Sequence, residues 1–316
     1  MLEGKLLRVA DRPWIEVAGS TSNLGPGFDL LGLALSLRLE VSVLEPARGA
    51  ECELVLAEDQ ARDWPPSPEN LLPRAFERAF RTFGGRGGAA VRFAVRSEIP
   101  VGRGLGSSAA AIVAGLLLGA ALAPGAVERA DLLRLALELE GHPDNVAPAL
   151  YGGCVIAVPR EGRAPRIVRQ ELHPSLGFAL AWPERPFATS LARGLLPRQV
   201  PFADAVENPR RLALLLEGLR SGDPELLALG SADRLHVPYR LPHIPGAQAA
   251  IESGRAAGAW MATLSGSGSA VLAIAARERA HEVAQAMAAG FRAAGERSEA
   301  RVVAPFLEAP SPRASS

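Results

Sequence analysis

Three glycines, two serines and a long apolar run follow one another over residues 102–123. Glycine backbone can turn its N–H groups inward and lets a ligand approach closely. The first turn of a helix adds unpaired N–H donors and a partial positive charge. Together these features bind anions, most often phosphate. Ser107 or Ser108 can cap the helix, and the other hydroxyl is then free for a metal ion or a phosphate oxygen.

The lysine content excludes several classes of phosphate-handling and cofactor-dependent enzymes. Lys5 is the only lysine of the chain. A Walker P-loop places a lysine before its serine or threonine, whereas Gly106 precedes Ser107 here. Protein kinases need a lysine on their third strand, and PLP enzymes need one for the Schiff base. The glycines also do not form a Rossmann Gly-x-Gly-x-x-Gly motif. Counted from Gly102 or Gly104, the third glycine would fall at Ser107 or Ala109.

A glycine- and serine-rich linker is the plainer interpretation of the same segment. The fifteen residues 109–123 that follow it are apolar, which is rare after a linker. This run is shorter than the ~18–20 residues of a membrane span, and it contains Gly115 and Gly119. We therefore expect a buried helix of a soluble protein that begins at an anion site.

The overall composition argues against nucleic acids, membranes and zinc. The 316 residues are 48% hydrophobic and carry 34 basic against 34 acidic side chains, so no net field attracts a polyanion. The N-terminus lacks the apolar core of a signal peptide, and Cys52 and Cys154 are expected to be free thiols in the cytoplasm. The five histidines form no His-x-x-x-His pair, which argues against a zinc site.

Hydrophobic periodicity predicts a mixture of strands and helices. Strands are expected at 14–19, 39–44, 89–95, 152–158, 177–182 and 270–275, helices at 70–83, 109–123, 129–140, 208–219, 224–229, 246–257 and 279–294, and polar loops at 20–27 and 138–145. The charged, proline-bearing segment 160–165 predicts a domain boundary, which gives domains over 1–165 and 166–316. Residues 310–316 are expected to form a disordered tail.

Residues 100–109, Pro-Val-Gly-Arg-Gly-Leu-Gly-Ser-Ser-Ala, resemble the central phosphate-binding motif of the GHMP kinases. Residues 17–29 resemble the first motif of that superfamily and residues 264–270 resemble the third, in the expected order. The resemblance implies an α+β, two-domain GHMP kinase fold. A ribosomal protein S5 domain 2-like N-terminal domain would bind ATP, and a ferredoxin-like C-terminal domain would close the site in the cleft between them. It also implies ATP and Mg²⁺ as cofactors.

Within this superfamily, three features resemble the homoserine kinases. The first motif reads Ser-Asn-Leu-Gly-Pro-Gly-Phe-Asp over 22–29, and residues 141–148 read Gly-His-Pro-Asp-Asn-Val-Ala-Pro. Thr189, Arg193 and residues 238–240 match substrate-side positions. The resemblance implies ATP-dependent phosphorylation of the L-homoserine hydroxyl, giving O-phospho-L-homoserine and ADP in threonine biosynthesis. Two alternatives stay open: another GHMP kinase with a mevalonate-like substrate, and a non-catalytic sensor on the same fold.

The resemblance also assigns substrate residues, and their chemistry suits a zwitterion that carries a hydroxyl. They are Asn23, Asp29, His142, Asp144, Thr189, Arg193 and Arg240, of which Asn23, Asp144 and Arg193 are expected to act in catalysis. Guanidinium groups hold a carboxylate bidentately, which suits the two arginines. The two aspartates can pair with an ammonium group, and Asn23 can hydrogen-bond the reacting hydroxyl. For each residue alone, the alternative is an ordinary surface ion pair or turn position.

For ATP, the resemblance implies that backbone amides of residues 102–108 surround the phosphates. The expected nucleotide-binding residues are Asn70 on the adenine side, and Pro100, Val101, Gly102, Arg103, Gly104, Leu105, Gly106, Ser107 and Ser108. Magnesium needs a few hard oxygen ligands. Ser108 and Glu138 are expected to supply them, with Glu140 as the alternative to Glu138.

Which side chain, if any, acts as the general base stays open. Sister families place a catalytic aspartate just ahead of a Gly-Gly pair, and counting back from Gly152 puts Asn145 at that position. An amide is no base, so positioning and charge neutralisation are expected to dominate, with the proton passing to the γ-phosphate. The third motif, 265–269, is expected to pack near residues 102–108, which we call the phosphate segment. It would serve there as a ligand contact or as a tight loop. A homodimer is a further expectation, because relatives are commonly dimers.

Overall fold

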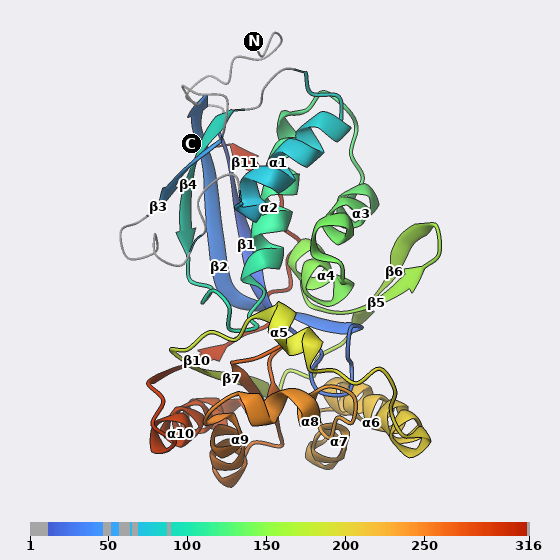
Figure 1. Cartoon of the computed structure of the whole chain (residues 1–316), viewed down its shortest axis with the longest axis vertical. Helices are drawn as coiled ribbons and strands as arrows, with labels where there is room; N and C mark the ends of the chain where they lie inside the picture. The colour runs from blue at the N-terminus through green and yellow to red at the C-terminus, as the bar shows by residue number, and fades with distance from the viewer. Residues whose placement is uncertain (1–11, 47–51, 57–63, 65–68, 87–89, 315–316) are drawn as a thin grey trace.

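The computed structural model describes residues 12–46, 52–56, 64, 69–86 and 90–314. Two bodies are stacked along the long axis of the molecule, each built from one sheet and a set of helices (Figure 1). The predicted α+β organisation is therefore confirmed.

The upper body contains the larger sheet. Its strands are β1 (Pro13–Ser22), β2 (Leu31–Pro46), β3 (Glu53–Leu56), β4 (Val91–Ser97), β5 (Cys154–Arg160), β6 (Arg163–Gln170) and β11 (Arg313–Ala314). The order is β11-β1-β2-β4-β3, while β5 pairs with the start of β2 and with β6. All of these pairs are antiparallel except β3 with β4.

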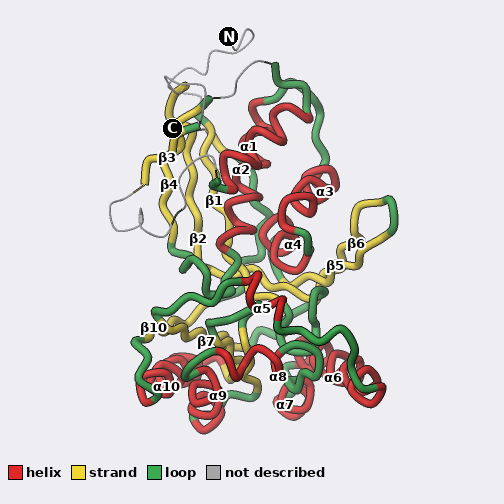
Figure 2. The backbone as a smooth tube through the Cα atoms, in the orientation of Figure 1, coloured by secondary structure: helices red, strands yellow, loops and turns green. Residues whose placement is uncertain are grey.

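Four helices cover one face of this sheet (Figure 2). They are α1 (Leu71–Thr82), α2 (Ser107–Leu122), α3 (Arg129–Glu140) and α4 (Pro143–Tyr151). Helix α2 is the central one, and every residue from 109 to 120 is buried. Gly115 and Gly119 allow α2 to pack closely against α1, because a Cβ on either residue would collide with the backbone of α1. The close approach of α1 and α2 holds the middle of α2, and the anion site is predicted at its start.

The lower body has a four-stranded antiparallel sheet in the order β10-β7-β9-β8. Its strands are β7 (Leu176–Pro183), β8 (Met261–Leu264), β9 (Val271–Ala276) and β10 (Ser298–Val303). Its helices are α5 (Thr189–Gly194), α6 (Phe202–Ser221), α7 (Pro224–Gly230), α8 (Val237–Arg240), α9 (Ala247–Ala256) and α10 (Ala280–Ala293), with 3-10 turns at Leu241–His243 and Arg277–Arg279. Helices α9 and α10 pack against the sheet through a second apolar core that includes Val283 and Phe291. Helix α5 lies between the two bodies (Figure 1).

The structure departs from the predicted loops at two places. The loop expected at 20–27 is shorter, because β1 continues to Ser22. The loop expected at 138–145 is mostly helical, because α3 runs to Glu140 and α4 starts at Pro143. Gly141 ends α3 with a left-handed φ of 87°, and a proline at the first position favours an immediate restart.

The first sheet extends beyond the boundary expected at residue 165. That residue lies inside β6, which pairs with β5 in a protruding hairpin (Figure 1). The predicted tail also differs from expectation, because β11 pairs with β1, and Arg129 donates a hydrogen bond to the Pro310 carbonyl at 2.8 Å. Residues 315–316 of that tail lie outside the described residues. We therefore propose that the first domain comprises residues up to Gln170 together with the returning C-terminal segment.

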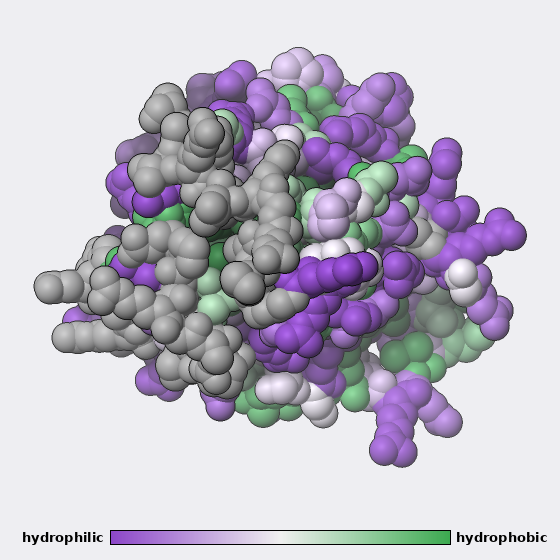
Figure 3. Space-filling view, turned by 90° about the horizontal axis from the view of Figure 1, so that it is seen from above, coloured by the Kyte–Doolittle hydropathy of each residue, from purple (hydrophilic) through white to green (hydrophobic). Residues whose placement is uncertain are grey.

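Viewed from above, the described surface of the upper body is largely hydrophilic, with apolar residues in small groups (Figure 3). None of the helices in the described ranges combines the length and the apolarity that a membrane crossing needs. The arrangement of the two bodies brings all three glycine-containing motifs to their junction, where the candidate site lies.

Candidate functional site

A cavity of about 250 Å³ lies between the start of α2 and the lower body. Most of the predicted site residues line it: Asn23, Asp29, Asn70, Val101, Gly102, Gly104, Leu105, Gly106, Ser107, Ser108, His142, Asp144, Thr189, Arg193 and Arg240. Ser22, Trp64, Leu71, Ala111, Glu140, Asn145 and Ser267 complete the lining. The cavity is therefore built from both domains, as the expected cleft requires. Pro100, Arg103 and Glu138 are the predicted residues that it does not include.

The phosphate segment owes its shape to its alternating glycines. Gly102, Gly104 and Gly106 have φ values of 73°, 72° and 73°, in the left-handed region that side chains disfavour. Gly106 is the N-cap of α2, so Ser107 and Ser108 are its first helical residues. The expectation that one of these serines caps the helix is therefore wrong. Their N–H groups instead stand at the helix start, where anions bind.

The third motif packs directly against this segment, as predicted. Ser265 Oγ donates a hydrogen bond to the Gly104 carbonyl at 2.7 Å, and the N–H of Ala270 donates to the Arg103 carbonyl at 3.0 Å. The N–H of Gly266 donates to the Ser22 carbonyl at 3.1 Å, which joins the third motif to the first. The three motifs thus form one hydrogen-bonded unit. Of the third motif, only Ser267 lines the cavity.

Ser108 meets Glu140, not Glu138. Ser108 Oγ donates a hydrogen bond to Glu140 Oε1 at 2.7 Å. Glu138 instead forms exposed ion pairs with Arg78 at 2.7 Å and Arg134 at 3.2 Å. Two residues along an α-helix turn the side chain by about 200°, so the two glutamates of α3 point to different sides. Of the two glutamates considered as magnesium ligands, Glu140 is therefore the one that contacts Ser108.

Asn23 joins the first motif to the third. Its φ is 67°, a conformation that asparagine tolerates better than most side chains. Its Nδ2 donates to the Gly266 carbonyl at 3.0 Å, and its Oδ1 accepts from the N–H of Asp29 at 3.0 Å. The side chain is buried, yet it lines the cavity. These two bonds leave one amide hydrogen and one oxygen lone pair of Asn23 unused, so its side chain can also hydrogen-bond to a hydroxyl.

Asp29 and Arg193 form a bidentate ion pair, with distances of 2.9 Å and 3.2 Å between their oxygens and nitrogens. The hydrogen bond and the charge of Asp29 raise the pKa of Arg193 against the opposing effect of burial. Both side chains are half-exposed to the cavity. The two residues expected to hold the opposite charges of one ligand therefore lie side by side.

His142 and Asp144 form a second hydrogen-bonded pair at the start of α4. His142 Nδ1 lies 2.7 Å from Asp144 Oδ1, and Asp144 is buried. Burial opposes the charged imidazolium, but the hydrogen bond and the charge of Asp144 prevail and raise the pKa of His142. The Asp144 carbonyl lies very close to Gly32 of β2, because a Cβ at residue 32 would overlap it. Helix α4 therefore packs tightly against β2 at this point.

Asn145 connects two residues of β1 through its side-chain amide. Its Nδ2 donates to Ser22 Oγ at 2.9 Å, and its Oδ1 accepts from Ser20 Oγ at 3.0 Å. An amide that both donates and accepts in this way orients the two serines. The position where sister families carry aspartate therefore holds a neutral amide that already makes two hydrogen bonds.

The remaining predicted residues take varied places. Thr189 Oγ1 lies 3.3 Å from Ser267 Oγ at the start of α5. Arg240, at the end of α8, is almost fully buried, and Nε donates to the Ala192 carbonyl at 3.3 Å. Asn70 is the N-cap of α1, where its Oδ1 accepts from the Leu72 N–H at 3.0 Å. The adenine contact expected of Asn70 stays a prediction.

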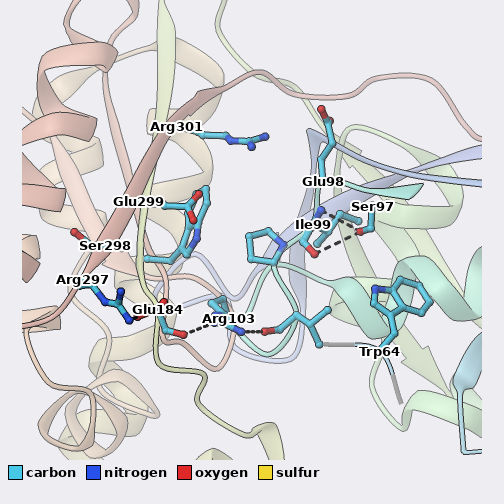
Figure 4. Close-up of a pocket in the computed structure, with 13 residues that line it drawn as sticks. Trp64, Ser97, Glu98, Ile99, Arg103, Glu184, Arg297, Ser298, Glu299 and Arg301 are labelled. Atoms are coloured by element: carbon cyan, nitrogen blue, oxygen red, sulfur yellow. Dashed lines mark hydrogen bonds and ion pairs between the residues drawn. The ribbon is translucent and has the colours of Figure 1, made fainter. Parts of the chain in front are cut away.

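A second cavity, of about 420 Å³, lies on the other side of the phosphate segment (Figure 4). The Arg103 side chain points into it and donates hydrogen bonds to the carbonyls of Val101 and Glu184, so it binds the segment to the end of β7. Trp64 and Val101 line both cavities, which therefore meet at these two residues. Pro100 and Arg103 lie on this side and not in the first cavity.

Sequence reasoning missed His236. This residue is the N-cap of α8 and contacts Arg240, the last residue of that helix. Its ring is fully buried, and its Nδ1 lies 3.0 Å from Arg240 Nη1. The spacing of four residues was the available signal, since residues i and i+4 are neighbours on a helix. Trp64 was also missed, because a lone tryptophan in a proline-rich segment carries no pattern.

Comparisons with known proteins agree with this arrangement. The family model described as the GHMP kinases N terminal domain matches residues 70–153, and the model of the GHMP kinases C terminal matches residues 215–293. A homoserine kinase of Moorella thermoacetica is 41% identical and covers 93% of this chain and 97% of its own length. One of Synechococcus sp. (strain CC9605) is 39% identical and covers 94% of both chains.

Solved structures show the same fold. A homoserine kinase from Cytophaga hutchinsonii has a TM-score of 0.85 at 28% identity and covers 98% of this chain and 99% of its own. A mevalonate kinase from Methanococcus jannaschii has a TM-score of 0.67 at 13% identity, covering 92% of this chain and 98% of its own. The second likeness concerns the fold alone.

Proposed function

Since the chain belongs to the homoserine kinase family of the GHMP kinases, we propose that it transfers the γ-phosphoryl group of ATP to the side-chain hydroxyl of L-homoserine. The products are ADP and O-phospho-L-homoserine, a step of threonine biosynthesis. The observation that carries the proposal is a set of opposite charges that gather beside the phosphate segment. Arg193, Arg240, Asp29 and Asp144 all line one cavity with the start of α2.

A zwitterion fits these charges without leaving one of them unpaired. The carboxylate of L-homoserine would accept hydrogen bonds from Arg193 and Arg240, since guanidinium groups match its two oxygens. The ammonium group would lie against Asp29 and Asp144. Because Asp29 already pairs with Arg193, both charges of the amino acid can insert beside an existing ion pair. This places the side-chain hydroxyl of the substrate toward Asn23.

ATP fits the opposite end of the cavity. Its phosphates would accept hydrogen bonds from the backbone N–H groups of residues 102–108, where the helix dipole of α2 also favours negative charge. Its adenine would lie against Trp64 and Val101, near Asn70. The γ-phosphate would then stand between the helix start and Asn23.

Magnesium fits the oxygen pair of Ser108 and Glu140. Mg²⁺ takes oxygen ligands and often keeps several waters, so one hydroxyl and one carboxylate suffice beside the phosphates of ATP. Within the described ranges, no group of three His, Cys, Asp or Glu side chains gathers as a metal site. The ion, when bound, neutralises charge on the β- and γ-phosphates.

The residues of the chain act by position and charge. The hydroxyl oxygen of homoserine forms a bond to the γ-phosphorus while the bond from that phosphorus to the β–γ bridging oxygen breaks, and ADP leaves with the electron pair. The hydroxyl proton passes to an oxygen of the transferred phosphoryl group. Asn23 orients the hydroxyl, and Arg193 helps to balance the negative charge nearby. Such a reaction, with a loose transition state, gains mainly from geometry and electrostatics.

Release of ADP by the purified protein with Mg-ATP, measured separately for L-homoserine, mevalonate, galactose and no acceptor, tests the function. We expect a kcat/KM for L-homoserine at least about 100-fold above that for mevalonate, because mevalonate lacks the ammonium group that the aspartates would pair. Equal turnover of mevalonate would remove the zwitterion argument. ATP binding without turnover of any acceptor would favour a non-catalytic sensor. The family membership does not favour that alternative.

Asn23→Ala is expected to lower kcat by about 100-fold, because the hydroxyl of the substrate loses its orienting partner. Asn145→Asp is the matched comparison and is expected to give no gain, since a carboxylate there faces Ser20 Oγ and Ser22 Oγ. Steady-state kinetics and a thermal melt of each variant measure the two effects. A kcat near the wild-type value in a folded Asn23→Ala protein would refute the role of this side chain.

A cytoplasmic location, a homodimer and the absence of nucleic-acid and membrane partners remain predictions from the sequence. The small-molecule substrate belongs to the same proposal as the function.

A further inference from the structure

Arg240 is held by acceptors that leave one nitrogen for a ligand. Its Nε donates to the Ala192 carbonyl, and its Nη1 donates to the Gly266 carbonyl at 3.3 Å and to His236 Nδ1 at 3.0 Å. Within the described residues, Nη2 has no hydrogen-bond partner, and Arg240 lines the cavity. The position of Nη2 is therefore set by the groups that hold Nε and Nη1.

The contacts of His236 determine its tautomer. Its Nε2 lies 3.0 Å from the Gly25 carbonyl, which can only accept, so Nε2 carries a proton. Its Nδ1 faces the guanidinium of Arg240, which can only donate, so Nδ1 must be bare. A doubly protonated ring would place an N–H against the N–H of Arg240. Burial lowers the pKa of His236 and keeps the ring neutral, although Asp233 is near.

The surroundings fix the ring and the guanidinium together. The Phe28 ring stacks on His236 with centroids 5.0 Å apart, and it lies 5.3 Å from the Arg240 guanidinium carbon. Asp233 accepts from the N–H groups of His236 and Val237 at 2.8 Å and 2.7 Å, which starts α8 in place. His236 thus links the first motif, through Gly25, to the arginine on the other domain.

We propose that His236 is a positioning residue: its bare Nδ1 aligns Arg240 so that Nη2 binds the carboxylate of the amino-acid substrate. This inference rests on the proposed function, because it assigns that carboxylate to Arg240. The ring itself touches no reacting atom. Its role is to supply an acceptor that stays neutral, since a carboxylate at the same place would compete with the substrate for the guanidinium.

Two substitutions separate the acceptor from the shape of the ring. His236→Asn places an amide oxygen near the position of Nδ1 and so keeps an acceptor for Arg240. His236→Gln places its amide near Nε2, which keeps the link to Gly25 and removes the acceptor. We expect the glutamine variant to raise the KM for L-homoserine by roughly 10- to 100-fold, as expected for a lost bond to a charged group. The asparagine variant should stay within about fivefold of wild type, and the KM for Mg-ATP should change in neither.

Nuclear magnetic resonance of the wild-type imidazoles gives a test that needs no stable variant. The chain has five histidines, so the ring signals are few, and the spectrum of His236→Gln identifies the missing one. Should that variant not fold, selective loss of one ring signal in His236→Asn serves instead. We expect a neutral ring with the proton on Nε2 at pH 7. A proton on Nδ1, or a cationic ring, would overturn the proposal.

The outcomes distinguish this inference from the function itself. If the wild-type protein does not phosphorylate L-homoserine, the proposed function fails whatever the variants do. If it does, and the glutamine and asparagine variants raise the KM for L-homoserine equally, His236 merely fills space and the inference fails alone. An unchanged KM in the glutamine variant would overturn it as well.

Discussion

Glu140→Gln is expected to lower kcat by about 100-fold or more, because the magnesium ion that we propose beside the phosphates would lose a charged ligand. The reason is the 2.7 Å hydrogen bond that places Glu140 beside Ser108 at the start of α2. Glutamine keeps the size and the hydrogen-bonding ability of the side chain but removes its negative charge. Steady-state kinetics as a function of Mg²⁺ concentration measures the effect, and higher Mg²⁺ should restore part of the lost activity.

Glu138→Gln is the matched control on the same helix. Glu138 is exposed, and its ion pairs with Arg78 and Arg134 are of the surface kind that contributes little to stability. We expect its kcat and its dependence on Mg²⁺ to stay within about twofold of wild type. The reverse result, a large loss in Glu138→Gln and little change in Glu140→Gln, would contradict the assignment of the magnesium ligand.

Gly106→Ala is expected to lower the kcat/KM for ATP by about 100-fold or more, because it distorts the phosphate segment. Gly106 has a φ of 73°, and a Cβ there would collide with the side chain and backbone of Ser20 on β1. To avoid this collision, the phosphate segment would have to move away from the first motif. The N–H groups of Ser107 and Ser108 would move with it. Kinetics with varied ATP, together with a thermal melt, measures this.

Gly162→Ala provides the control for the left-handed backbone alone. Gly162 has a φ of 63° in the turn between β5 and β6, but a Cβ there meets open space. We expect its melting temperature to fall slightly, since the strained backbone costs ~1–2 kcal/mol, while its kinetics stay unchanged. If Gly106→Ala bound and used ATP as well as Gly162→Ala does, the phosphate segment would not depend on the close contact with β1.

The backbone form of residues 102–123 could be predicted from the sequence, whereas phosphate binding by residues 102–108 stays a prediction. Alternating glycines before a long apolar run anticipate left-handed turns and a buried helix, and both are present. The predicted membership in the GHMP kinases, and in their homoserine kinase family, is confirmed by the two family models and by a relative of 39% identity. The ordered motifs contact one another through backbone hydrogen bonds, such as the one from the N–H of Gly266 to the Ser22 carbonyl.

The choice between Glu138 and Glu140 could not be made from sequence. Both lie in the last turn of α3, and only the phase of that helix against α2 decides which one meets Ser108. The pairing of β11 with β1 was equally hidden, because it joins residues 313–314 to the first strand across the whole chain. The short connection between α3 and α4 was missed because the polar residues near Pro143 also suit a loop.

His236 shows a different limit. His236 is the N-cap of the short helix α8, and the usual interpretation of a single buried histidine is plain packing. Its contact with Arg240 follows the i to i+4 spacing, but its contact with Gly25 spans 211 residues of the chain. Only the folded chain brings Gly25 of the first motif to the histidine that contacts Arg240.

Phosphorus magnetic resonance of one competition reaction tests the central claim most directly. The wild-type protein, Mg-ATP and equal concentrations of L-homoserine, mevalonate and galactose are combined, and the products are followed as ATP disappears. We expect one new phosphomonoester signal that grows with ADP and coincides with added O-phospho-L-homoserine. A phosphomonoester of another acceptor, or ADP and inorganic phosphate alone, would contradict the account.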